Sequence, residues 1–354
     1  MPARPKLSLV LPIFNEEEII PELDRRLRAF LSDLPDIGDD WEIVFIDDGS
    51  RDKSLSMLEA LSAAEPRYKI IALSRNFGHQ LAITAGMDRA EGEAVVVMDA
   101  DLQDPPEVVV EMLARYRDGF DIVYAIRKRR HGETLFKRAT AALFYRFLRA
   151  MLGVTIPLDA GDFRLMSHRV VLTLRGLREH HRFVRGMVAW VGFKSTAVTY
   201  DRPARFAGET KYPFRKMLRF AVDGITSFSI VPLRAATWLG LLSGALALSV
   251  AAWAVYVRFY VNEVVPGWTT IMIMVALGSS AQLLMTGILG EYVGRIYEEV
   301  KRRPLYVVAH ETNFEHPDRR AYDSRRVPVI DASPAPVIDA TSKDAAPKDA
   351  PPPA

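Results

Sequence analysis

Two long apolar segments lie close together in the C-terminal half of the chain, and they constrain its fold more than any other feature. Residues 235–257 contain no charged side chain, and residues 267–290 contain only Gln282 as a strongly polar one. Each segment has about the 20 residues that an α-helix needs to cross a hydrocarbon core of about 30 Å. Tryptophan and tyrosine residues lie towards the ends, where interfacial anchors are expected. The sequence therefore predicts two transmembrane helices, with a pair of helices buried in a soluble core as the alternative.

Basic residues flank this pair of segments on the outer sides. They are Arg215, Lys216, Arg219 and Arg234 before the first segment, and Arg295, Lys301, Arg302 and Arg303 after the second. By the positive-inside rule, both flanks lie in the cytoplasm and the short connection near Val264 lies on the other side. The first residues lack an apolar stretch long enough for a signal peptide, so the chain is expected to start in the cytoplasm. The sequence predicts a membrane hairpin with both termini cytoplasmic.

Amphipathic and low-complexity regions surround the hairpin. Residues 213–234 carry apolar side chains at helical spacing with charged residues on other faces, which predicts an interfacial amphipathic helix. Residues 134–152 have the same character, and an ordinary amphipathic core helix is an equal alternative there. Residues 291–321 are expected to form a cytoplasmic juxtamembrane segment. Residues 322–354 are rich in Pro, Ala and Asp and are predicted to be disordered.

Short apolar strands alternate with helical segments in residues 1–212. The predicted strands are 7–11, 43–46, 69–73, 94–98 and 121–125. Residues 17–30 keep the apolar spacing of a helix. Alternation of strand and helix is typical of a mainly parallel sheet that binds ligands at the carboxyl ends of its strands. We therefore expect residues 1–212 to form one α/β domain.

Polar loops follow four successive strands of this predicted sheet. After the fourth strand come Asp99, Asp101 and Gln103. Two carboxylates one residue apart, followed by an amide, provide hard oxygen ligands through which a divalent cation can bridge to a diphosphate. A lone Asp-x-Asp is more often a solvated turn, and one acidic loop can be a helix cap. Four polar loops at successive strand ends favour a nucleotide-sugar site instead.

The composition excludes several other kinds of site. The chain has no cysteine, so disulfides, thiolate catalysis and cysteine-based zinc sites are ruled out. Its basic clusters flank apolar segments rather than aromatic stacking platforms, and we expect no nucleic-acid partner. His180 and His181 have no third ligand at metal spacing, so we expect them to be surface histidines in a flexible loop.

Eight motifs along the chain carry a family resemblance. They lie at residues 11–17, 47–50, 75–78, 99–106, 161–164, 182–186, 205–212 and 289–295. In them the chain resembles the membrane-bound, family-two glycosyltransferases of the GT-A fold, which move a sugar from a nucleotide onto a polyprenyl or dolichyl phosphate. The resemblance extends from Leu7 to about Val308. It is strongest to the bacterial undecaprenyl-phosphate glucosyltransferase type with a two-helix hairpin.

The resemblance implies a fold, a reaction and a set of site residues. The fold is an α/β GT-A catalytic domain with a Rossmann-like mixed sheet, and the reaction is a metal-dependent, inverting sugar transfer. The implied donor-binding residues are Pro12, Asn15, Glu16, Asp47, Asp48, Arg75 and Asp99. The implied ligands of Mg²⁺ or Mn²⁺ are Asp101 and Gln103, and those of the acceptor phosphate are Arg127, Arg138, Arg205 and Lys211. Guanidinium and ammonium groups suit a lipid phosphate.

Asp162, Arg164 and Asp99 are the candidate catalytic residues. Asp99 is expected to face the donor sugar and its ribose. A phosphate acceptor is already anionic at neutral pH, so it needs a general base less than a sugar hydroxyl does. Asp162 either orients the acceptor and receives a residual proton, or forms a structural ion pair with Arg164. Both alternatives remain open from the sequence.

The expected donor is UDP-glucose and the expected acceptor is undecaprenyl or another polyprenyl phosphate. The reaction is expected at the cytoplasmic face of a bacterial-type inner membrane. GDP-mannose and modified sugars of the aminoarabinose type are alternative donors. The small residues Gly240, Gly244, Gly278 and Ser279 offer close-packing faces for a homo-oligomer.

Two other functions are alternatives to this one. A processive polysaccharide synthase normally has a Gln-x-x-Arg-Trp motif, but residues 182–186 read Arg-Phe-Val-Arg-Gly, and two spans are too few for an obvious polymer channel. A membrane-tethered nucleotide-binding scaffold without catalysis is the second alternative. The intact Asp99, Asp101 and Gln103 argue against a scaffold.

Overall fold

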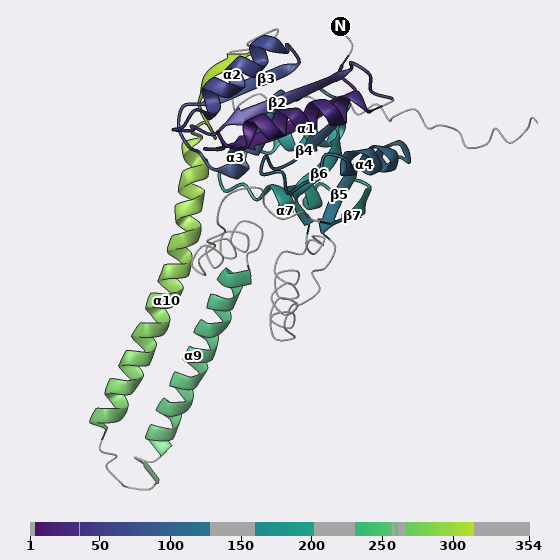
Figure 1. Ribbon diagram of the computed structural model, residues 1–354. Helices are drawn as coiled ribbons and strands as arrows, with labels where there is room; N and C mark the ends of the chain where they lie inside the picture. The colour runs from purple at the N-terminus through teal and green to yellow at the C-terminus, as the bar shows by residue number, and fades with distance from the viewer. Residues whose placement is uncertain are drawn as a thin grey trace, which may run out of the picture.

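The computed structural model describes residues 4–34, 36–127, 160–201, 231–256, 259–260 and 267–314. Within these ranges, strands form one mixed sheet in the order β7-β5-β6-β4-β1-β2-β3-β8 (Figure 1). The strands are β1 (Leu7–Ile13), β2 (Trp41–Asp47), β3 (Tyr68–Leu73), β4 (Ala94–Val97), β5 (Ile122–Arg127), β6 (Ala160–Ser167), β7 (Ser195–Tyr200) and β8 (Val308–Thr312). The expected α/β fold with a Rossmann-like mixed sheet is confirmed.

Helices cover both faces of the sheet and bury two apolar cores. On one face lie α1 (Ile20–Ser32), α2 (Ser54–Ala64) and α4 (Val108–Arg117), and on the other lie α3 (His79–Arg89), α6 (His168–Gly176) and α7 (Val184–Trp190). Alternate residues of each strand point to opposite faces, so Leu9 joins the first core and Val10 the second. Burial on both faces explains why the central strands read as continuous apolar runs.

The five predicted strands are present, and their ends differ from the prediction by at most two residues. The predicted strands do not include β6, β7 or β8. β7 runs parallel to β5, whereas β6, between β4 and β5, and β8, beside β3, run antiparallel to their neighbours. The motif around Asp162 and Arg164 therefore belongs to a strand inside the sheet. Charged residues interrupt its apolar pattern, which is why no strand was predicted there.

Two long helices, α9 (Val231–Tyr256) and α10 (Trp268–Lys301), extend from the domain side by side (Figure 1). Their 26 and 34 residues correspond to lengths of about 39 and 51 Å. By length and composition, Val231–Trp253 and Ile273–Lys301 can each cross a membrane. Only 6% and 0% of the residues in their most apolar stretches are buried. This exposure argues against helices of a soluble core.

The boundaries of these helices differ from the predicted ones. α9 begins at Val231, inside the region predicted to be interfacial, and α10 continues to Lys301 instead of ending at residue 290. Charged residues after position 290 do not end the helix, because Glu291 and Arg295 form an ion pair of 2.9 Å between successive turns of α10. The helix ends where Arg302 takes a left-handed conformation, with φ of 49°. Between the two helices, Gly240 lies against Met285.

The segment after α10 returns to the α/β domain and completes its sheet. Arg89 and Glu311 form a double hydrogen bond of 3.1 and 2.9 Å, with side chains only 12% and 10% exposed. Asn313 donates to the carbonyl oxygens of Ser62 and Tyr68. The region predicted as a simple juxtamembrane segment therefore contributes a strand and a buried ion pair to the domain.

His180 and His181 contact the C-terminal end of α10. His180 lies 3.2 Å from Glu299 and 2.9 Å from the carbonyl oxygen of Arg303, and His181 lies 2.6 Å from Glu298. Both histidines lie, as expected, in the loop between α6 and α7 and are partly exposed, and their side chains connect this loop to α10.

We expect Glu311→Ala to lower the free energy of unfolding by about 2 kcal/mol or more, because it leaves the largely buried Arg89 without its carboxylate. Thermal or denaturant unfolding of the purified protein measures this change. Glu59→Ala is the matched control, since its carboxylate is 45% exposed and lies 3.8 Å from His310 of the same strand. The control should change stability by less than about 0.5 kcal/mol. Equal stability of the two variants would contradict a structural role for β8.

Several predicted features lie outside the described residues. They are Arg138, Arg205, Lys211, the helix at 134–152, most of the interfacial region 213–234, the connection near Val264 and the tail 322–354.

Candidate active site

One edge of the sheet collects the site residues predicted from the sequence that lie in the described ranges. The carboxyl ends of the parallel strands β1, β2, β3 and β4 meet there, because these strands are adjacent in the sheet. β6 runs the other way, so its first residues lie at the same edge, beside the last residues of β5 and β7. This topology brings Asp162, Arg127 and the acidic loop after β4 to one side of the domain.

The loops after β1 and β2 are joined by side-chain hydrogen bonds. The backbone N–H of Asn15 donates to Ser50 Oγ at 3.0 Å, and Asn15 Oδ1 accepts the N–H of Arg51 at 2.8 Å. The N–H of Glu16 donates to Ser54 Oγ at 2.9 Å. Asn15 itself has a left-handed φ of 55°, which asparagine tolerates better than most residues. These loops form one connected rim, and Pro12 lies at its base within β1.

Asp47 and Asp48 are both buried, and their carboxylates organise backbone. Asp47 accepts the N–H of Ser50 at 3.2 Å. Asp48 accepts the N–H groups of Phe77 and Gly78 at 2.7 and 2.9 Å, so it orders the loop after β3. Burial raises the pKa of both groups above the ordinary aspartate value, although these hydrogen bonds oppose the shift. The structure adds a loop-ordering role for Asp48 to the predicted nucleoside contact.

Gly49 allows the loops after β2 and β3 to approach each other. Its φ is +69°, and a Cβ there would lie 2.5 Å from the carbonyl carbon of Arg75. Only glycine fits so close an approach at that φ. Arg75 is exposed and its guanidinium lies over the ring of Phe77, 4.0 Å from the centroid. The side chain predicted to hold the donor is therefore carried by a loop that Asp48 and Gly49 position together.

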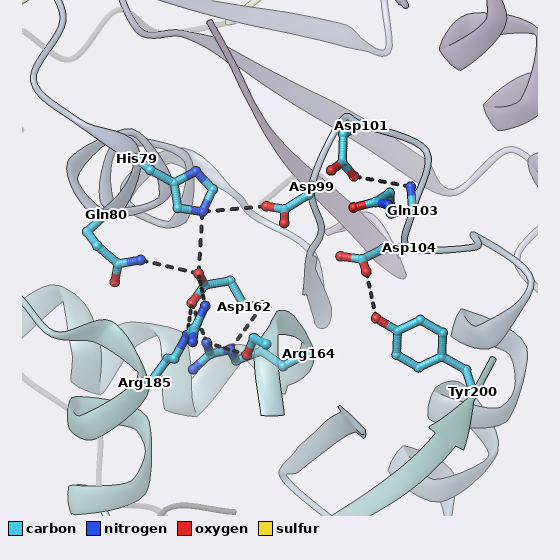
Figure 2. Close-up of polar contacts among 11 residues, drawn as sticks. His79, Gln80, Asp99, Asp101, Gln103, Asp104, Asp162, Arg164, Arg185 and Tyr200 are labelled. Carbon is cyan, nitrogen blue, oxygen red and sulfur yellow. Dashed lines mark hydrogen bonds and ion pairs between the residues drawn. The ribbon is translucent and has the colours of Figure 1, made fainter. Parts of the chain in front are cut away.

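The acidic loop after β4 has the oxygen donors of a divalent cation site. Asp101 Oδ1 accepts the backbone N–H of Gln103 at 3.1 Å, and Leu102 between them has a left-handed φ of 58° (Figure 2). Such a conformation costs about 1–2 kcal/mol for a residue with a Cβ, and strain of this kind clusters at functional sites. No group of three or more His, Asp or Glu side chains in the described residues is arranged to hold a metal. Two protein oxygens fit Mg²⁺ or Mn²⁺, since Mg²⁺ usually takes one or two carboxylates and completes its shell with waters and phosphate oxygens.

Asp162 is the centre of a buried charged cluster (Figure 2). Its carboxylate accepts hydrogen bonds from Arg164 at 2.8 Å and from two nitrogens of Arg185 at 3.0 and 2.9 Å. Gln80 Nε2 donates to it at 3.3 Å, and His79 Nε2 lies 3.4 Å away. The side chains of Asp162 and Arg164 are 4% and 1% exposed. The cluster joins β6, α7 and the start of α3.

Electrostatics separates the two candidate catalytic carboxylates. Burial raises the pKa of Asp162, but hydrogen bonds from His79 and Arg185 and the charge of Arg164 outweigh it, and its pKa lies well below the ordinary value. Burial raises the pKa of Asp99 to about 6, although the charge of His79 opposes the shift. A carboxylate with so low a pKa is a weak proton acceptor. The hydrogen bonds from Arg164 and Arg185, together with this low pKa, favour the ion-pair alternative for Asp162 over the general base.

His79, Gln80 and Arg185 are residues of this cluster to which the sequence alone assigned no role. His79 Nε2 lies 3.5 Å from Asp99 Oδ1 and 3.4 Å from Asp162 Oδ2, so one imidazole joins carboxylates from two strands. Burial lowers the pKa of His79, but the hydrogen bond to Asp162 and the charge of Asp99 outweigh it and raise the pKa. The sequence signal for His79 was its position at the end of the polar loop that follows the predicted strand 69–73.

Arg127 is the acceptor-site candidate that the structure describes. It ends β5, is paired in register with Tyr200 of β7, and donates from Nε to the Tyr200 hydroxyl at 3.3 Å. The other three basic candidates lie outside the described residues. Arg127 is partly exposed at the same edge as Asp101 and Asp162, which is the location expected for an acceptor contact.

A mixed α/β sheet with an Asp-x-Asp-x-Gln loop at its carboxyl edge, flanked by polar loops, defines a glycosyltransferase of the GT-A type. Residues 8–174 match the family described as Glycosyl transferase family 2. The chain is 47% identical over 309 residues to the uncharacterized glycosyltransferase YkcC of Bacillus subtilis, covering 87% of this chain and 95% of that protein. The protein belongs to glycosyl transferase family 2.

Two further proteins are similar to this chain. The bactoprenol glucosyl transferase of Shigella phage SfII is 39% identical over 303 residues, which cover 86% of this chain and 97% of that protein. Among solved structures, the mannosyltransferase PcManGT from Pyrobaculum calidifontis, in complex with GDP-Man and Mn²⁺, is 18% identical with a TM-score of 0.41. That match covers 80% of this chain and 88% of the other.

We expect Asp48→Ala to weaken nucleotide binding about tenfold or more, with a smaller effect on turnover at saturating donor. The reason is that two backbone N–H groups lose a charged acceptor, each worth about 1.5–3 kcal/mol, and the loop carrying Arg75 loses its order. Calorimetric titration with UDP measures the affinity. Glu65→Ala is the control, because Glu65 also accepts a backbone N–H, that of Arg67, away from the site. An unchanged dissociation constant in Asp48→Ala would refute this role.

Proposed function

We propose that this glycosyltransferase moves a hexose from a nucleoside diphosphate onto the phosphate of a polyprenyl lipid at the membrane surface. Glucose from UDP-glucose is the first candidate. The observation that carries the proposal is the shared edge of the sheet, where Asp101 and Gln103, the proposed metal ligands, lie on the same side as Arg127 and the Asp162 cluster. A relative that is 39% identical over most of both chains and is named a bactoprenol glucosyl transferase supports the choice of lipid and sugar.

The proposed reaction is a direct displacement. An oxygen of the acceptor phosphate attacks the anomeric carbon, and the bond from that carbon to the donor's β-phosphate oxygen breaks, with inversion of configuration. The phosphate nucleophile is already anionic, so no residue has to remove a proton before attack. A Mg²⁺ or Mn²⁺ ion held by Asp101 and Gln103 would neutralise the charge of the departing nucleoside diphosphate.

The chain's own residues divide between the donor and the acceptor. On the donor side, Asp48 orders the loop that carries Arg75, and Asp99 faces the sugar. Pro12, Asn15, Glu16 and Asp47 complete the nucleoside side of this proposed pocket. On the acceptor side, Arg127, Arg138, Arg205 and Lys211 hold the lipid phosphate, because guanidinium groups bind phosphate oxygens in pairs. Arg164 and Arg185 keep Asp162 ionised and fixed between the two sides.

A membrane hairpin fits the path of the chain. The catalytic domain precedes α9, and β8, which follows α10, pairs with β3 of the same domain. A chain that enters a membrane in one helix and comes back in the next ends on the side where it began. We infer that the domain and both flanks of the hairpin lie on the cytoplasmic side, as the basic flanking residues predict. A homo-oligomer through exposed faces of α9 and α10 remains a proposal.

A donor screen tests the proposed function. The purified enzyme is incubated with undecaprenyl phosphate, Mg²⁺ or Mn²⁺ and, in turn, UDP-glucose, GDP-mannose and a UDP-linked aminoarabinose. The expected product is glucosyl-phosphoryl-undecaprenol with release of UDP. A lipid product from another donor would correct the sugar and leave the reaction class in place. Binding of UDP without any lipid-linked product would favour a nucleotide-binding scaffold.

Site-directed labelling tests the proposed orientation. The chain has no cysteine, so single cysteines at Asn262 and Ser342 can be labelled without background. On intact cells, a membrane-impermeant maleimide should label the cysteine at residue 262 and leave the one at residue 342 unlabelled. Permeabilised cells serve as the control, in which both should react. Equal labelling of both positions on intact cells would overturn the hairpin.

A further inference from the structure

Tyr200, at the end of β7, contacts three segments that carry proposed site residues. Its hydroxyl donates to Asp104 Oδ1 at 2.6 Å and accepts from Arg127 Nε at 3.3 Å. Its ring packs edge-on against Phe163 of β6, with centroids 5.7 Å apart. Figure 2 shows Tyr200 pointing at Asp104, on the loop that also carries Asp101 and Gln103. Tyr200 therefore connects the loop after β4 with β5 and β6.

Both partners in the short hydrogen bond are withdrawn from solvent. Asp104 is 1% exposed and Tyr200 is 5% exposed. Burial, together with the charge and hydrogen bond of Asp104, raises the pKa of Tyr200, so the hydroxyl keeps its proton at neutral pH. A hydrogen bond from a neutral hydroxyl to a buried carboxylate is charge-assisted and directional. The tyrosine therefore fixes the position of the Asp104 carboxylate relative to β7.

The contact links a donor element to an acceptor element. Asp104 follows Gln103 directly, so its position determines where the loop places the oxygens of Asp101 and Gln103. Arg127 is the register partner of Tyr200 in the neighbouring strand and uses the hydroxyl as an acceptor for one of its N–H groups. An arginine that shares one N–H with a fixed hydroxyl keeps its remaining donors in a defined direction.

We propose that Tyr200 is a positioning residue which, through Asp104 and Arg127, holds the metal-ligand loop and the acceptor-phosphate arginine in a fixed mutual arrangement. The inference rests on the proposed function for the role of Arg127 and on the chain's own geometry for the rest. In this proposal Tyr200 acts through its two partners and does not bind the nucleotide or the lipid itself. It acts on catalysis by keeping the diphosphate site and the acceptor phosphate at the distance that direct displacement requires.

The test is Tyr200→Phe, which keeps the ring and removes only the hydroxyl. Two quantities are measured: the Mn²⁺ concentration that gives half-maximal UDP binding, by calorimetry, and the KM for undecaprenyl phosphate at saturating UDP-glucose and Mn²⁺. Both should rise by about fivefold or more, while the KM for UDP-glucose at saturating Mn²⁺ changes less than twofold. A change in only one of the two, or in neither, would overturn the proposed link.

Tyr68→Phe is a closely matched control. Tyr68 is also buried, donates to a carboxylate oxygen of Asp24 at 2.7 Å and packs edge-on against Phe45 with centroids 5.5 Å apart, but it lies at the start of β3. It should affect stability and leave both measured quantities unchanged. If it changes them as Tyr200→Phe does, the effect is general destabilisation and the inference fails. If the wild type transfers no sugar to the lipid, the proposed function fails, and the Mn²⁺ titration still tests the link to Asp104.

Discussion

Asp101→Ala is expected to abolish sugar transfer, with a loss of about a thousandfold or more in kcat/KM. In the proposed metal site, Asp101 is the charged ligand and Gln103 the neutral one, so this substitution would leave a single amide to hold the cation. The negative charge that develops on the departing nucleoside diphosphate then has no fixed counter-charge, and electrostatic groups of this kind are worth about 10²–10³ in rate each.

The measurement is transfer of labelled glucose to undecaprenyl phosphate at several concentrations of Mg²⁺ and Mn²⁺. UDP binding by Asp101→Ala should also lose its dependence on the metal. Asp118→Ala is the control, because this aspartate is exposed at the end of α4 and forms only a 3.7 Å pair with Arg115. Turnover close to wild type in saturating Mg²⁺ would refute the metal assignment.

Asp162→Asn is expected to cost about 3–5 kcal/mol of unfolding free energy and to abolish transfer. The substitution removes the charge that compensates Arg164, whose side chain is 1% exposed, and it weakens the paired hydrogen bonds from Arg185. Removing one partner of a buried ion pair leaves the other charge buried and uncompensated. The resulting loss of stability is larger than the net stabilisation that the intact pair provides. Activity is lost because His79, which contacts Asp99, loses the carboxylate that fixes it.

The contribution of Asp162 also has a predictable pH dependence. Its pKa is well below the ordinary value in the folded protein and near 3.9 in an unfolded chain, so the unfolded state binds the proton more readily. The stabilisation is therefore fully present above about pH 5 and is lost as the pH falls through the folded-state pKa. The difference in unfolding free energy between wild type and Asp162→Asn should be constant from pH 5 to 7 and narrow below about pH 4.

Asp121→Asn is the control for both measurements. Asp121 is likewise buried, accepts hydrogen bonds from Arg169 and Ser167, and lies before β5 at the opposite edge of the sheet. It should lower stability while the kinetic constants for donor and acceptor stay normal. If Asp162→Asn retained wild-type kinetics at a temperature where it is folded, the cluster would be structural only.

The parts of the fold that could be predicted are those with a local signal. A strand buried on both faces reads as a short apolar run, and five such runs correspond to β1 through β5. A helix long enough to cross a membrane can be predicted from its own sequence, since its length and lack of charged residues suffice. The helix ends were less predictable, because α10 passes through charged residues before Arg302 ends it.

β6 and β8 had no such local signal. β6 contains Asp162 and Arg164, which are charged residues that a local pattern does not assign to a buried strand. They are buried as an ion pair in a strand that lies between β4 and β5. β8 is short and largely polar, and it pairs with β3 across more than two hundred residues of chain, including both long helices. Pairing over such separations depends on contacts elsewhere in the fold, which sequence periodicity does not contain.

The sequence by itself determined the acidic strand-end loops, the two apolar helices and the absence of cysteine chemistry, because each depends on residue types at short spacing. The tertiary structure alone decided that Asp162 carries a buried cluster, that His79 joins it to Asp99, and that Tyr200 links Asp104 to Arg127. These contacts come from strands that run in opposite directions and from helix ends that meet at one edge. A side chain's chemical role follows from its neighbours in space, and antiparallel insertion of β6 sets those neighbours here.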